Sequence, residues 1–97
     1  MTRAEFDAST TLDKPPEGIS VPLAALWWDA KGDWTRAHEL VDELETPEGM
    51  AVHAYLHRKG GDASNAEYWY KRAGRVPSKV SLEAEWEDLV GEMISGG

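Results

Sequence analysis

The sequence predicts an all-α domain, and three observations support this fold class. Apolar residues recur three and four positions apart along most of the chain after residue 20, which is the spacing of one buried helix face. Gly-Asp pairs at 32–33 and 61–62 each join a favoured helix end to a favoured helix start. No segment alternates apolar and polar residues as a half-buried strand does. We therefore expect about five helices.

The first 18 residues are predicted to be a flexible tail, and residues 19–97 to form the single folded domain. The tail mixes polar residues without a sustained helical period, and its consecutive Pro15 and Pro16 favour an extended backbone. A short helical turn over residues 3–8 is the alternative for this segment.

Capping residues define the first predicted helix pair. Ser20 can accept hydrogen bonds from the free N–H groups at a helix start, and Gly32 suits the left-handed position just beyond a helix end. Asp33 can cap a second helix at once, and the apolar period continues to about Leu44. Two helices joined by a tight corner are therefore expected over about residues 20–44.

Three more helices are predicted over about residues 47–59, 63–74 and 81–94. Thr46 followed by proline is a helix-start signal, and Asp62 repeats the aspartate cap of the first pair. The last helix has one apolar face, and its other faces are acidic.

The two helix pairs form an internal repeat. A shift of about 29 residues places Gly32 and Asp33 on Gly61 and Asp62, and it aligns small residues that let helices approach closely. Residues 57–79 hold six basic and two acidic side chains, whereas residues 80–97 hold five acidic and no basic ones. We expect the acidic last helix to cap the basic second pair, with homodimer formation through its apolar face as the alternative.

This repeat resembles the tetratricopeptide and Sel1-like helical-repeat families. The matching residues are Ala25, Trp28, Gly32, Asp33, Trp34, Ala37 and Val41 in the first unit, and Ala54, Gly61, Asp62, Ala66, Tyr70 and Ala73 in the second, followed by Pro77. The repeat is shorter than the ~34 residues of a tetratricopeptide unit, and His57 stands where the family pattern prefers an aromatic residue. The stretch from His53 to Tyr70 also resembles a group of small bacterial proteins, which implies a fold and no particular activity.

The tetratricopeptide resemblance implies TPR-like antiparallel helix pairs whose first helices line a peptide-binding groove. Carried over residue by residue, it nominates Trp27, Asp29, Leu56 and Arg58 as groove residues. The resemblance therefore favours a non-enzymatic module that binds a protein or peptide partner. Packing of the tryptophans in the core is the alternative role for the aromatic positions.

Composition excludes several classes of function. The formal net charge of −8 disfavours sequence-independent nucleic-acid binding, which needs a basic face. The chain has no cysteine, so thiol catalysis and cysteine-ligated metal are excluded. No apolar run is long enough for a membrane span, and we expect a cytoplasmic protein without nucleic-acid or membrane partners.

Two histidines carry the alternative function, which is small-ligand or metal binding. His53 and His57 are four residues apart on one predicted helix, the spacing that lets two imidazoles reach one divalent ion. His38 or Glu39 could add a ligand, but neither stands at a characteristic spacing. We expect the pair to be hydrogen-bonded core histidines and assign no metal ligand, no cofactor and no catalytic residue.

Overall fold

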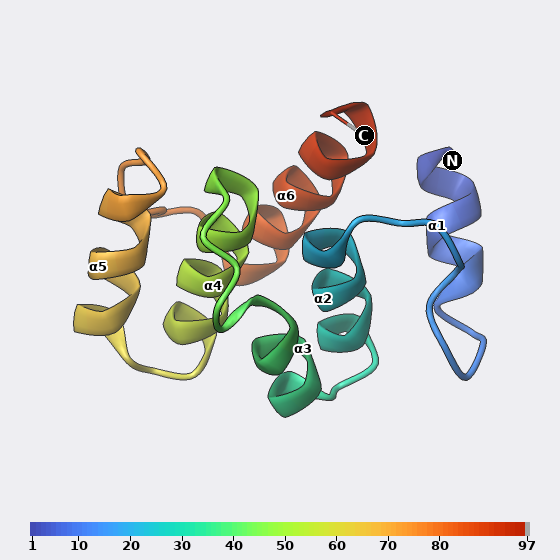
Figure 1. The fold of residues 1–97 in the computed structure, drawn as a ribbon, viewed down its shortest axis with the longest axis horizontal. Coiled ribbons are helices and arrows are strands. Elements are labelled where there is room, and N and C mark those ends of the chain that lie inside the picture. The colour runs from blue at the N-terminus through green and yellow to red at the C-terminus, as the bar shows by residue number, and fades with distance from the viewer. Residues whose placement is uncertain (97) are drawn as a thin grey trace.

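The chain folds into six helices and no strand over residues 1–96, which are the residues that the computed structural model describes (Figure 1). The helices are α1 (Arg3–Ser9), α2 (Val21–Ala30), α3 (Trp34–Val41), α4 (Pro47–Lys59), α5 (Ala63–Arg72) and α6 (Leu82–Gly96). The all-α class is confirmed, whereas the expected count of about five helices is too low by one. Within this described part, no helix is both long enough and apolar enough to cross a bilayer.

The additional helix is α1, which lies in the segment predicted to be a tail. It begins with a capping box, in which the Thr2 hydroxyl accepts from the Glu5 N–H at 3.1 Å and the Glu5 carboxylate accepts from the Thr2 N–H at 2.8 Å. Phe6 is fully buried, and its ring lies 6.1 Å from that of Trp86 on α6. The N-terminal segment therefore contributes an aromatic side chain to the core.

The two predicted helix pairs are present and turn through equivalent corners. α2 packs against α3, and α4 packs against α5 (Figure 1). Gly32 and Gly61 both have φ of +83°, a region that favours glycine. The caps that follow have nearly identical dihedrals, −104° and 75° at Asp33 and −103° and 76° at Asp62. These values support the internal repeat, and whether the pairs belong to the tetratricopeptide type stays a prediction.

α6 lies against α2 and α4 (Figure 1). Its residues Leu89, Val90 and Met93 belong to the hydrophobic core. Two ion pairs join it to the basic segment, Arg58 with Glu85 at 2.8 Å and Arg75 with Glu92 at 2.6 Å. These ion pairs agree with the expected attraction between the acidic helix and the basic segment. α6 packs on α2 of the first pair as well as on α4, so it does not cap the second pair alone.

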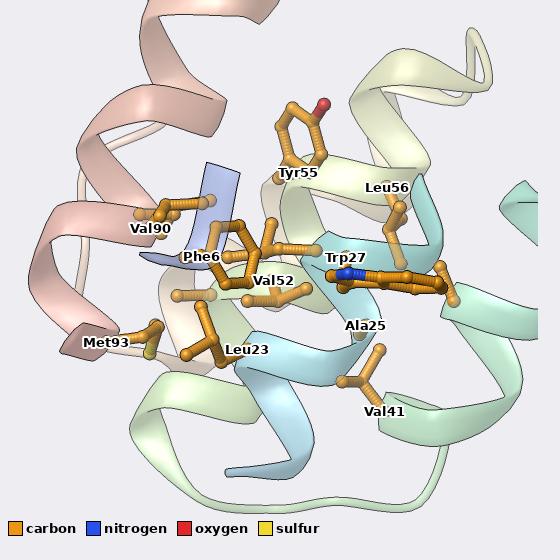
Figure 2. Packing of buried hydrophobic residues seen from close by; sticks show 14 residues of the cluster. Phe6, Leu23, Ala25, Trp27, Val41, Val52, Tyr55, Leu56, Val90 and Met93 are labelled. Carbon is orange, nitrogen blue, oxygen red and sulfur yellow. The ribbon is translucent and has the colours of Figure 1, made fainter. Parts of the chain in front are cut away.

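Trp27 is the largest fully buried side chain of the core (Figure 2). Its indole N–H donates to the Ser9 hydroxyl at 3.1 Å, and that hydroxyl donates to the Phe6 carbonyl at 2.6 Å. A buried indole N–H without an acceptor would be costly, so Ser9 allows this ring to be buried. The hydrogen bond from Trp27 to Ser9 connects α2 to α1.

Candidate metal centre

All three histidines of the chain meet at one place between α3 and α4. The Nε2 atom of His53 lies 3.1 Å from Nε2 of His38 and 3.0 Å from Nε2 of His57. One ligand nitrogen from each of the three rings lies within 4.8 Å of both others. The histidine cluster, by which we mean these three residues, therefore presents three nitrogen atoms to a common point.

The helices explain this convergence. His53 and His57 are one turn apart on α4, so their side chains lie on one face. His38 reaches them from α3, whose position against α4 is held by a hydrogen bond from the Trp34 indole N–H to the Leu56 carbonyl at 2.8 Å. The cluster thus joins the first helix pair to the second.

Two tryptophan rings form walls of the cluster. Trp34 stacks on His38 with the ring centroids 4.9 Å apart and the planes inclined by 8°. Trp69 stacks on His53 at 4.1 Å and 24°, and the Arg72 guanidinium lies 5.0 Å from the Trp69 ring. These stacked rings restrict the rotation of the imidazoles and shield them from water.

Burial makes the cluster electrostatically unusual. The His53 side chain is only 2% exposed, and burial together with repulsion from the other two imidazoles lowers its pKa to about 4. Burial and the neighbouring His38 also lower the pKa of His57. His53 is therefore neutral at pH 7, the form in which an imidazole can bind a metal.

Hydrogen bonding alone leaves this cluster incompletely satisfied. A neutral imidazole has one N–H and one lone pair, yet Nε2 of His53 faces two other nitrogens. If that nitrogen accepts, the His53 proton is at Nδ1, which is buried and has no protein partner. A cation between the three Nε2 atoms would use all three lone pairs at once, although it would not provide a partner for Nδ1.

The groove residues nominated by the tetratricopeptide resemblance lie elsewhere. Trp27 and Leu56 are fully buried, so neither side chain is available to a peptide in this structure. Asp29 is 4% exposed and accepts hydrogen bonds from the Tyr55 hydroxyl at 2.6 Å and the Lys59 ammonium at 2.8 Å.

Arg58 is likewise engaged inside the molecule. It pairs with the buried carboxylate of Glu85, which also accepts from the Tyr70 hydroxyl. Of the six nominated residues, the structure brings together only His53 and His57, and it adds His38 to them.

The sequence alone does not place His38 beside His53 and His57. Its spacing of 15 residues from His53 has no metal-site signature, because the contact depends on how α3 and α4 pack. The usable signal was that Trp34 precedes His38 by one helical turn, which puts an aromatic ring and an imidazole on the same face.

Comparisons with protein-family models, with curated proteins and with solved structures found no match for this chain. The resemblance to tetratricopeptide and Sel1-like repeats therefore stays a prediction.

Proposed function

We propose that this chain binds one divalent transition-metal ion through His38, His53 and His57, and that the ion fastens the first helix pair to the second. The observation that carries the proposal is the convergence of Nε2 atoms from α3 and α4. All three ligands already lie together on the adjacent helices α3 and α4.

The spacing between the nitrogens supports this proposal. Zinc binds imidazole nitrogen at 2.0–2.1 Å, and a tetrahedral arrangement at that radius separates neighbouring ligand atoms by about 3.3–3.4 Å. The separations of 3.1 and 3.0 Å from His53 to the other two histidines are therefore within about 0.4 Å of those in a metal site. The ligand nitrogens of His38 and His57 lie within 4.8 Å of each other.

The donor set indicates which class of ion fits. Three imidazoles suit zinc, copper, nickel and iron, whereas magnesium and calcium prefer oxygen ligands. The low pKa of His53 limits competition from protons at neutral pH. We therefore take Zn²⁺ as the reference ion, with Ni²⁺ and Co²⁺ as probes of the same site.

Such an ion would act on the stability of the fold. It binds the folded chain and bridges α3 to α4, so its binding free energy adds to the free energy of unfolding. At a free metal concentration one hundred times the Kd, the gain is about 2.7 kcal/mol. The free energy of unfolding would then rise with the concentration of free metal.

Calorimetric titration of metal-stripped protein with Zn²⁺, followed by competition with a chelator, tests the proposal. We expect one equivalent to bind, and we expect His38→Gln and His57→Gln each to weaken binding at least about tenfold. Glu39→Gln is the matched control, since Glu39 is an exposed acid beside His38 that lies outside the cluster. Absence of saturable binding of Zn²⁺, Ni²⁺ and Co²⁺ would refute the proposal, as would undiminished binding by both histidine variants.

We also retain the peptide-binding function as a second proposal, because the equivalent corners at Asp33 and Asp62 support the duplicated helix pair on which it depends. With Trp27 and Leu56 buried, a peptide would have to use other side chains of these helices. A peptide array probed with the folded protein should then give at least one saturable ligand, and a blank array would count against this function.

A further inference from the structure

The structure leads to a further inference about the proposed metal site, and it rests on that proposed function. We infer that Asp42 supplies the fourth ligand, so that the ion is held in a closed His₃Asp site and no position is left for a substrate.

Asp42 lies beside His38. The Asp42 carboxylate lies 3.8 Å from Nε2 of His38, about 0.4–0.5 Å longer than the separation of two ligands on one tetrahedral ion. It lies outside the group of three histidines whose ligand atoms are within 4.8 Å of one another, so it has to turn toward the ion to bind it. Asp42 is the C-cap residue of α3, one helical turn beyond His38. Its side chain is 58% exposed, so it has room to turn toward the ion.

Asp62 is the other carboxylate near the cluster, and hydrogen bonds already hold its oxygens. Asp62 influences His57 electrostatically, but its oxygens accept from the Asn65 N–H at 3.2 Å and the Asn65 side-chain amide at 3.2 Å. Those bonds hold Asp62 as the cap of α5. Asp42 has no such hydrogen bond in the described structure, where His38 is its one ionic partner.

The location of Asp42 at the C-terminal end of α3 also favours a nearby cation. The C-terminal end of a helix carries partial negative charge, so a carboxylate there is unfavourable unless a cation lies close by. Asp42 occupies this position on α3, and the proposed ion would supply that cation. Removing the carboxylate should thus have opposite effects, with a small gain in the stability of the metal-free protein and a loss of metal affinity.

The consequence concerns the class of site. Zinc sites with four protein ligands are structural, whereas catalytic sites keep one position for water or substrate. An ion held by three histidines and Asp42 would therefore have a structural role and would link α3 to α4.

Cobalt substitution tests this inference on the full chain. Co²⁺ in a four-coordinate site absorbs visible light much more strongly than the hydrated ion, so binding and geometry are observed together. We expect the unaltered protein to give the intense spectrum. Asp42→Asn should weaken Co²⁺ binding at least about tenfold and shift the bands, and Asp42→Glu should retain part of the affinity. Glu43→Gln, which removes the same charge from the neighbouring exposed acid, should change neither.

The outcomes separate the two proposals. If the unaltered protein binds no Co²⁺ or Zn²⁺, the proposed function fails and this inference with it. If it binds and Asp42→Asn keeps the same affinity and spectrum, the inference alone is wrong, and the fourth position belongs to solvent. If Asp42 contacts only His38 and not the ion, its removal should leave the Co²⁺ affinity no weaker.

Discussion

Replacing Phe6 by alanine tests whether the N-terminal helix is part of the folded core. The ring is fully buried between α1 and α6, so its removal takes away transfer free energy and leaves a cavity. Truncation of such a phenylalanine costs about 3–5 kcal/mol. For a domain of this size, each kcal/mol lowers Tm by about 4–8 °C, so we expect a loss of at least about 12 °C.

Leu12→Ala is the matched control, because Leu12 is an apolar side chain of the same segment that is 57% exposed. It should change the free energy of unfolding by less than about 0.5 kcal/mol. Urea and thermal denaturation followed by circular dichroism measure both variants. If Phe6→Ala is as stable as Leu12→Ala, α1 does not pack on the core and our description of the N-terminal segment is wrong.

Three further predictions concern the helix caps at the two corners, His53 and the buried phenol of Tyr55. Asp33→Ala and Asp62→Ala should each lower the free energy of unfolding by about 1 kcal/mol in urea denaturation. If the losses in the two variants differ from each other by well above that amount, the two corners are not equivalent. His53→Leu should abolish Zn²⁺ binding in calorimetry yet leave the metal-free protein folded by circular dichroism, since it removes a buried nitrogen without a partner. Burial and the hydrogen bond to Asp29 raise the pKa of Tyr55, so stability present below pH 10 should fall as the pH rises further. Tyr55→Phe should lessen that fall in alkaline urea denaturation, and an identical pH profile would refute the assignment.

The helices that the sequence predicted well are those whose ends are set locally. Asp33, Thr46 and Asp62 each cap a helix as expected, because a cap requires only the next three residues. α1 corresponds to the helical turn that the sequence offers only as the alternative to a flexible tail. Its capping box of Thr2 and Glu5 was legible, but the burial of Phe6 depends on a surface of α6 that lies about eighty residues away in the chain.

The histidine cluster was predictable only in part. The spacing of His53 and His57 is a property of one helix, so the sequence could propose that pair. The addition of His38 depends on the register between α3 and α4, which no local pattern specifies. The groove assignment of Leu56 was carried over from the resemblance, and in the structure this residue is buried.

Three indole N–H groups each cross a different boundary between helices. Trp27 donates to Ser9 between α2 and α1, Trp34 to the backbone of α4, and Trp86 to the Leu26 carbonyl at 3.0 Å between α6 and α2. Separation of any of these boundaries would release one indole to water and shift its fluorescence to longer wavelength. The protein thus carries a fluorescent reporter at each of three boundaries between helices. Variants that keep one of these tryptophans at a time would show the order in which the boundaries separate.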